Sequence, residues 1–282
     1  MRTLSVGKAI VSVINVGDFT WDLTEKMHIP ESAWRPHYAA YFERPQLFPT
    51  QGIHIALPGA SILVDPCYHD LASGFLSLMP DYQQPPRLMA QLAEKGVQPE
   101  DITHVVITHA HFDHYADVTR EQEGHVLPCF PHAHCFLGRA DWEDRRVQEA
   151  LQDPSSNESR TLGVLHQYRL LELVEGNRDL VPGVQMIAAP GETPGHYIVR
   201  VHSEGQTLYC LGDLYHHEVE FEQPTWMVHW IDQERNLKSR SALMEAALAE
   251  HALLLAAHIP IGYLKQAGSE IKWMALEREP RG

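Results

Sequence analysis

The sequence predicts a layered sandwich of β-sheets and helices, of the α/β or α+β class. Short apolar and β-branched runs recur through both halves of the chain, and segments of helical composition lie between them. Elements that alternate in this way pack as layers around a core. With 44% hydrophobic residues among 282, a sizeable core is available. This length allows one large or two smaller domains, and we expect residues 1–282 to form a single domain.

Turn residues bound the predicted elements of the first half. Pro58-Gly59 separates two strands of a hairpin, and Gly96 is the expected end of a helix over residues 86–95. Residues 17–50 are rich in proline, aromatic and charged residues without a clear period, so we predict a long loop excursion near the functional site. The predicted strands span residues 9–16, 53–57, 61–65 and 104–108.

The second half continues the mixture of strands and helices. Residues 141–152 and 239–250 have helical composition, and residues 191–195 form a turn rich in glycine and proline. A turn at Glu204-Gly205 joins two strands into a second hairpin. The predicted strands span residues 168–174, 184–189, 197–202, 207–211 and 252–257.

Charge and composition exclude several classes of partner. The formal net charge is −15, whereas nucleic acids and anionic membranes require a basic surface. Four cysteines without a CxxC pair indicate buried thiols in a reducing compartment rather than a disulfide framework. No stretch approaches the roughly twenty apolar residues of a membrane span, and the N-terminal apolar run is too short for a signal peptide. We therefore expect a cytoplasmic protein without nucleic-acid or membrane partners.

The most specific feature is a histidine-rich cluster directly after the apolar run 105–108. A buried strand that stops there would aim the short side chains that follow it at one point. Imidazole suits zinc, and a carboxylate adds an oxygen ligand and negative charge. The cluster therefore predicts a metal-dependent hydrolase. Four metal-binding side chains lie within six positions: His109, His111, Asp113 and His114.

A site for two metal ions needs further ligands at strand ends or glycine-rich turns, where the backbone can approach a metal. Three candidates have this position: His196, Asp213 and His258. Taken singly, a histidine at a strand end is more often a hydrogen-bonding residue, and an aspartate after glycine is often a turn former. Taken together with the cluster, and in this order, they predict the remainder of a two-metal site.

These motifs resemble the metallo-β-lactamase superfamily. The resemblance rests on HxHxDH at 109–114, TPGH at 193–196, LGD at 211–213 and the strand-terminal His258, and it runs from Asp65 to His258. It implies a four-layer αβ/βα sandwich, in which two mixed β-sheets pack face to face with helices outside. The metal site would lie at one edge between the sheets.

The resemblance also implies two zinc ions per chain. Asp213 would bridge the ions together with a water or hydroxide. Asp65 matches an aspartate that orients a ligand histidine through its free ring nitrogen, and otherwise it is a turn residue before Pro66. One ion would be held by His109, His111 and His196, and the other by Asp113, His114 and His258.

Departures from other branches of the family narrow the prediction. Lactam-cleaving members that use a cysteine ligand would carry it near position 213, where this chain has Asp213. Diiron flavoproteins of this fold carry an acidic residue where this chain has His111, which favours zinc. Nucleases of the family usually carry a large added domain, and the charge of −15 is wrong for them.

The segment after Asp213 is similar to lactonases and to methyl parathion hydrolase. Homoserine-lactone lactonases place a tyrosine three residues after the bridging aspartate, but here His216 stands there and Tyr215 is one residue early. The Asp-x-x-His-His pattern is closer to methyl parathion hydrolase and its lactonase relatives. We predict that His216 reaches the substrate pocket as a catalytic residue and that His217 is solvated.

The predicted activity is hydrolysis of a lactone or another activated ester, a small-molecule substrate, by a metal-bound hydroxide nucleophile. Asp113 is placed to take or relay a proton in addition to its ligand role. Alternatives are an organophosphate triesterase, a glyoxalase II-like thioesterase and, from another class, a non-catalytic zinc-binding protein.

Six apolar side chains are candidate walls of the substrate pocket, although core or subunit packing would explain them equally well. They are Phe19, Trp21, Met27, Trp226, Met227 and Trp230. The family resemblance also makes a homodimer possible.

Overall fold

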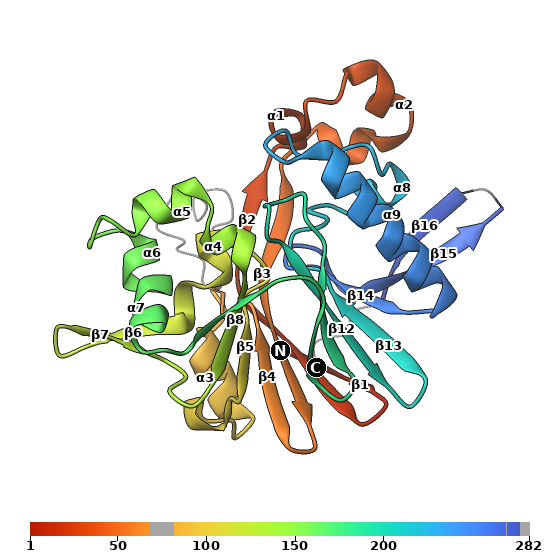
Figure 1. The fold of residues 1–282 in the computed structure, drawn as a ribbon. Helices are drawn as coiled ribbons and strands as arrows, with labels where there is room; N and C mark the ends of the chain where they lie inside the picture. Colours follow the sequence, from red (N-terminus) through yellow and green to blue (C-terminus); the bar gives the residue numbers. More distant parts are fainter. Residues whose placement is uncertain (68–81, 269, 277–282) are drawn as a thin grey trace.

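Two mixed β-sheets pack face to face in the computed structural model, which describes residues 1–67, 82–268 and 270–276 (Figure 1). The first sheet has the order β1-β2-β3-β4-β5-β8-β9 and the second the order β10 to β16. The strands of the first sheet are β1 (Arg2–Val6), β2 (Ala9–Trp21), β3 (Gln46–Leu57), β4 (Ala60–Val64), β5 (His104–Val106), β8 (His134–Gly138) and β9 (Leu171–Val174). The strands of the second are β10 (Arg178–Val181), β11 (Val184–Ala188), β12 (Tyr197–Ser203), β13 (Gln206–Cys210), β14 (Leu253–Leu255), β15 (Gly262–Ala267) and β16 (Glu270–Ala275).

Helices cover the outer faces of both sheets, which makes four layers and confirms the predicted αβ/βα sandwich (Figure 1). A separate hairpin, β6 (Thr119–Gln122) and β7 (His125–Pro128), projects beside the first sheet. Beside this sheet lie α3 (Leu88–Glu94), α4 (Arg139–Trp142), α5 (Arg145–Ala150), α6 (Asn157–Arg160) and α7 (Leu162–Gln167). Beside the second lie α8 (Val219–Glu222) and α9 (Gln233–Ala249). Within the described ranges, the helices are all too short or too polar to cross a bilayer.

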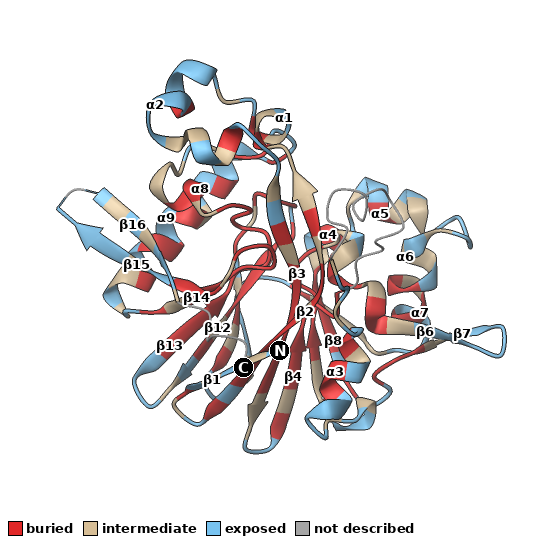
Figure 2. Cartoon of the chain, turned by 180° about the vertical axis from the view of Figure 1, so that it is seen from behind, coloured by how far each residue is buried: buried red, intermediate tan, exposed pale blue. Residues whose placement is uncertain are grey.

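The alternation of side chains along each strand produces these layers. In β4, Ile62 and Val64 point into the core between the sheets, whereas Leu63 points to the helices on the other side. In β12, Val199 faces the other sheet and Ile198 faces α9. Figure 2 shows the resulting pattern, with buried residues on the strands in the middle and exposed residues on α2 and on the β15–β16 hairpin.

The predicted loop excursion over residues 17–50 is wrong, because this segment has regular structure. The strand predicted to end at residue 16 continues, since the irregularity between Asn15 and Gly17 is a bulge and pairing with β3 resumes after it. Pro36 lies inside a helix that is kinked at Tyr38, which explains the missing period. The segment contains the end of β2, α1 (Leu23–Met27), α2 (Glu31–Phe42) and the start of β3.

Candidate metal centre

Several strands end at the same edge of the sandwich, and this edge collects the predicted ligands. β4 and β5 run parallel, so Asp65 and the cluster after β5 emerge side by side. β13 and β14 are also parallel, and Asp213 and His258 follow their ends. β12 is antiparallel to β13, so His196, which precedes β12, lies at that same edge. Side chains far apart in the sequence therefore meet here.

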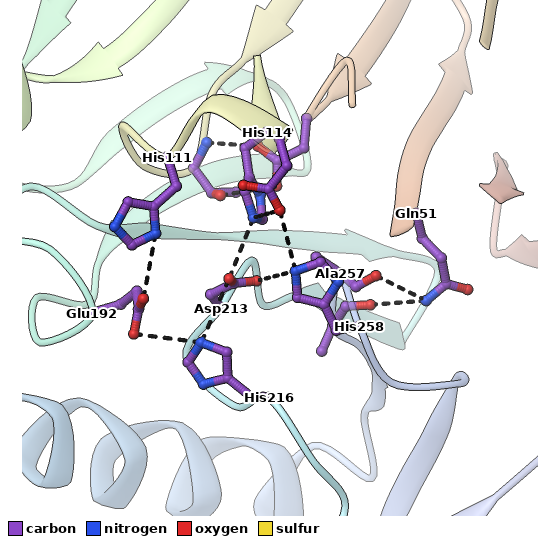
Figure 3. Close-up of polar contacts among 12 residues, drawn as sticks. Gln51, His111, His114, Glu192, Asp213, His216, Ala257 and His258 are labelled. Atoms are coloured by element: carbon purple, nitrogen blue, oxygen red, sulfur yellow. Dashed lines mark hydrogen bonds and ion pairs between the residues drawn. The ribbon is translucent and has the colours of Figure 1, made fainter. Parts of the chain in front are cut away.

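The first group of donors lies around Asp213. The predicted ligands Asp113, His114 and His258 lie close enough to share one metal ion. Asp213 Oδ2 is 3.3 Å from His114 Nε2, and Asp213 Oδ1 is 3.4 Å from His258 Nε2. Asp113 Oδ2 is 3.5 Å from each of these two imidazole nitrogens. Figure 3 shows the side chains of His114, Asp213 and His258 pointing toward one another.

A second group lies on the other side of Asp213. His109 Nε2 is 2.9 Å from His111 Nδ1 and 3.8 Å from Asp213 Oδ2. Glu192, which the sequence prediction did not use, adds a carboxylate oxygen 3.4 Å from His111 Nδ1. These four residues, like the first group, could hold one metal ion. The structure thus places two donor sets beside a shared aspartate.

The donor spacing fits metal ions. Two ligand atoms on one tetrahedral zinc lie about 3.3 Å apart, since each is about 2.0–2.1 Å from the ion. The distances of 3.3, 3.4 and 3.5 Å around Asp213 and Asp113 match that separation. Moreover, His114 Nε2 and Asp213 Oδ1 are buried and lack a hydrogen-bond partner among the described residues. Buried polar atoms are rarely left in this way, so a cation between them would satisfy the set.

The electrostatics are those of a site that binds cations. Burial lowers the pKa of His109 well below the usual value, and the neighbouring His114 and His111 lower it further, so His109 is neutral and can donate a lone pair. Burial alone would raise the pKa of Asp213, but His114 and His258 hold it well below its usual range. A metal ion would take the place of the protons on these histidines.

The remaining predicted site residues are also buried here. His196 has its ring 5.2 Å from that of His109, while its Nε2 accepts from the backbone N–H of Asp213 and its Nδ1 meets the carbonyl of Ala189. His216 is 1% exposed, with Nε2 3.5 Å from Asp213 Oδ2. The prediction of a solvated His217 is wrong: it is 8% exposed, packs against Tyr41 and accepts from the N–H of Val219.

Asp65 orients His114, as predicted. Its Oδ1 accepts from the backbone N–H of Thr108 at 2.8 Å and its Oδ2 from the Thr108 hydroxyl at 2.8 Å. The same Oδ2 lies 3.0 Å from His114 Nδ1, which leaves Nε2 of that ring facing Asp213. Such a contact fixes the tautomer and direction of a ligand imidazole.

Asp65→Asn is expected to weaken metal binding by about 10- to 100-fold while the fold is kept. The amide keeps the shape but places a donor or a weaker acceptor against His114 Nδ1. Asparagine also tolerates the left-handed backbone of Asp65, whose φ is 50°. The measurement is the chelator concentration that removes half of the bound metal. Asp179→Asn, on exposed β10, is the control, and equal chelator resistance in both variants would contradict the role of Asp65.

Two further residues hold the loops of the site, and sequence reasoning missed both. The Asp141 carboxylate accepts from the N–H groups of Ala110 and Gly195 and from the Thr193 hydroxyl, which joins the two histidine loops. Gly195 is required there, since a Cβ would lie 2.4 Å from the Asp141 nitrogen. Gln51 of β3 donates to the carbonyls of Ala256 and Ile259, and so ties the His258 loop to the first sheet. Figure 3 shows its side chain pointing at Ala257, whose carbonyl lies 3.4 Å from Nε2. Neither lies in a recognisable motif.

A cavity of 590 Å³ opens onto the two sets of possible metal ligands around Asp213. Of the six predicted wall residues, Trp21 and Trp230 line it. The other four pack in apolar clusters, as the alternative of core packing predicts. One cluster, beneath α1 and α2, contains Phe19, Met27 and Trp226, and a smaller one beside the cavity contains Met227. The other lining residues are His111, Asp113, Asp144, Arg146, Gly191, Glu192, Thr193, Pro194, Asp213, Asp232, Arg235 and His258.

Comparison with known proteins gives consistent results. A family model described as the metallo-beta-lactamase superfamily matches residues 53–247. An N-acyl homoserine lactonase of Bacillus cereus is 25% identical over 186 residues, a match that covers 64% of this chain and 65% of the relative. The chain therefore spans slightly less than two thirds of that relative's length.

Two solved structures share the fold over nearly the whole chain. Hydrolase AbOPH of the beta-lactamase superfamily has a TM-score of 0.78 at 16% identity, with 98% of this chain and 97% of the other covered. AidC, a dizinc quorum-quenching lactonase solved with its product N-hexanoyl-L-homoserine, has a TM-score of 0.75 at 18% identity, with 99% and 98% covered.

Proposed function

Because the chain belongs to the metallo-beta-lactamase superfamily, we propose that it is a dinuclear zinc hydrolase that cleaves a lactone or another activated ester. The observation that carries this proposal is the position of the donors. His111, Asp113, Asp213 and His258 all line the cavity, so a bound ion there would face substrate. A structural zinc site is closed and tetrahedral, whereas this one offers more donors than one zinc needs and is open on one side. The curated relatives named N-acyl homoserine lactonase favour a lactone as the first substrate to try.

The residues that would hold the ions fall into two sets around Asp213. When bound, two dications would supply Lewis acidity and make a water nucleophilic near neutral pH. The family resemblance assigns His109, His111 and His196 to one ion and Asp113, His114 and His258 to the other. Five of these six offer a ligand atom in one of the two donor sets, whereas both ring nitrogens of His196 are engaged, by the N–H of Asp213 and the carbonyl of Ala189.

The chain's own residues supply the rest of the chemistry. Asp113 is 37% exposed at its side chain and lines the cavity, so it is placed to pass a proton to the leaving alkoxide. His216 is 1% exposed and is not among the described residues that line the cavity, so the prediction that it reaches the substrate pocket as a catalytic residue is wrong. Its Nε2 lies 3.5 Å from Asp213 Oδ2, which suits a residue that positions Asp213. The indole faces of Trp21 and Trp230 would contact an apolar acyl or aryl group.

A thioesterase of the glyoxalase II kind would need basic residues to bind the carboxylates of glutathione, and the C-terminal third gives this alternative little support. Arg240 is fully buried and so offers no contact to a glutathione carboxylate. At the cavity itself, Arg146 and Arg235 are both engaged by aspartates, Asp144 and Asp232. A lactone, by contrast, needs no anion-binding group beyond the metal site.

A substrate panel tests the proposal. We expect the zinc-loaded protein to hydrolyse γ-, δ- and acyl-homoserine lactones with the highest kcat/KM. Aryl esters, phosphotriesters of the paraoxon type and lactoylglutathione should follow by about an order of magnitude or more, because curated relatives are named lactonases and the arginines at the cavity are already engaged by aspartates. Initial rates for each compound, measured with matched enzyme concentration, rank the classes.

The controls separate the candidate functions. Protein treated with chelator and dialysed should lose the activity and regain it on addition of zinc. Highest kcat/KM on the phosphotriester or on lactoylglutathione would replace the lactonase assignment with that class. No turnover of any ester by protein carrying two zinc ions would support a binding protein instead.

A further inference from the structure

Glu192 places a buried carboxylate in the site that neither the sequence motifs nor the two-zinc scheme uses. Its side chain is 1% exposed. Oε1 accepts a hydrogen bond from the indole N–H of Trp230 at 2.9 Å and lies 3.4 Å from His111 Nδ1. Oε2 lies 3.5 Å from His216 Nε2 and lacks a hydrogen-bond partner within the described part of the chain. Figure 3 shows the carboxylate between the two imidazoles.

A buried carboxylate in this position requires a cation. Removing an ionised carboxylate from water costs several kcal/mol unless it is paired, as a rule about buried charges. No arginine or lysine forms an ion pair with Glu192 among the described residues, and its charged neighbours are other carboxylates and imidazoles. One indole N–H satisfies only part of its four acceptor positions. In metal-free protein a protonated His216, 3.5 Å from Oε2, can supply this charge, and a dication beside His111 would take its place.

The backbone holds Glu192 rigidly in this direction. Gly191 has a φ of +149°, and a Cβ there would lie 2.3 Å from the Cα of Asn236, so the turn is pressed against the start of α9. The N–H of Asp232 donates to the carbonyl of Gly191 at 2.9 Å. The carboxylate is therefore held in the site before any ligand arrives, as a metal ligand should be.

We propose that Glu192 is a ligand of the ion held by His109 and His111. The proposal rests on the proposed dinuclear site and adds a carboxylate oxygen to one of its two positions. His109, His111, Glu192 and Asp213 lie close enough to share an ion. Imidazole ligands suit zinc, copper, iron and nickel, whereas carboxylate oxygen suits harder ions such as manganese, so an added carboxylate makes this position more accommodating to manganese. Trp230 orients the ligand oxygen and connects the cavity wall to the metal.

Cobalt titration of metal-free Glu192→Gln tests the proposal. Glutamine keeps the size of the side chain and an acceptor for Trp230 but removes the charge. Wild-type protein should take up two cobalt ions per chain. In the variant one of the two should bind at least about 10-fold more weakly, with a changed visible absorption spectrum for that ion. The matched control is Asp144→Asn, which removes one charge from the same cavity and keeps the N-cap of α5.

The outcomes separate this inference from the proposed function. If wild type binds fewer than two ions, the dinuclear site itself fails. If wild type binds two and Glu192→Gln binds both with unchanged affinity and spectrum, Glu192 is a wall residue and the inference is overturned. A crystal structure of zinc-loaded wild type gives an answer without any variant. A Glu192 oxygen about 2.0–2.2 Å from the anomalous peak supports ligation, whereas a separation above about 3 Å overturns it.

Discussion

Asp213→Ala is expected to lower kcat/KM at least about 1,000-fold, which corresponds to ~4 kcal/mol of transition-state stabilisation. Asp213 faces both donor sets, since Oδ2 lies 3.3 Å from His114 and 3.8 Å from His109 and Oδ1 lies 3.4 Å from His258. Without it, neither position keeps its full set of ligands, and the bound metal should fall below two per chain. Kinetics on the best substrate and elemental analysis of the same preparation measure both effects.

The fold of this variant should survive. Asp213 raises the pKa of both Asp113 and Glu192, so its removal relieves some like-charge repulsion, but it also removes the carboxylate that faces His114 and His258 in metal-free protein. Because His114 and His258 hold the pKa of Asp213 well below its usual range, its ionised carboxylate stabilises the metal-free fold, and we expect the Tm of metal-free Asp213→Ala to fall below that of metal-free wild type with a cooperative transition retained. Asp179→Ala, on exposed β10, serves as the control for an aspartate lost elsewhere. His111→Ala should lose activity in the same way. Full turnover in both single variants, Asp213→Ala and His111→Ala, would refute the assignment of the site.

The strand pattern and the donor motif could be predicted because both are local. Short apolar runs and the turn residues between them predicted the hairpins around Pro58-Gly59 and Glu204-Gly205, and the structure has both. Asp213 and His258 each follow an apolar run, and the family resemblance predicted that they share one edge; the structure explains why, since β13 and β14 are parallel and end together. In the structure each ligand follows its strand by three residues: β5 ends at Val106, β13 at Cys210 and β14 at Leu255.

The residues that were missed depend on tertiary contacts. Glu192 sits in a glycine-rich turn, and nothing in the turn shows that the start of α9 presses it toward His111. Asp141 lies in α4, yet its carboxylate accepts from two loops that are distant in sequence. His217 is predicted to be solvated, but packing of Tyr41 from α2 buries it. A loop over residues 17–50, as the sequence predicts, contains no helix that would supply this packing.

Arg240→Met is expected to lower the free energy of unfolding by about 3–5 kcal/mol, the cost of leaving a buried charge unpaired. Arg240 and Glu220 are both 0% exposed at their side chains and form an ion pair at 2.6 Å. The same guanidinium donates to the carbonyls of Leu214, Pro224 and Trp226 and lies over the ring of Tyr215. It therefore joins α9 to the segment that follows Asp213. Denaturant unfolding of the metal-free protein measures the change.

The matched control lies on the same helix. Arg235→Met removes an arginine whose side chain is 59% exposed, so its effect should stay within about 0.5 kcal/mol. Equal stabilities of the Arg240 and Arg235 variants would refute the structural role of the buried pair. Adding Glu220→Met to Arg240→Met removes the unpaired carboxylate and should restore part of the loss. The restoration should be incomplete, because three carbonyls remain without their donor. It should also be incomplete because the backbone N–H of His216 loses Glu220 as its acceptor, which leaves the residue beside Asp213 less well held.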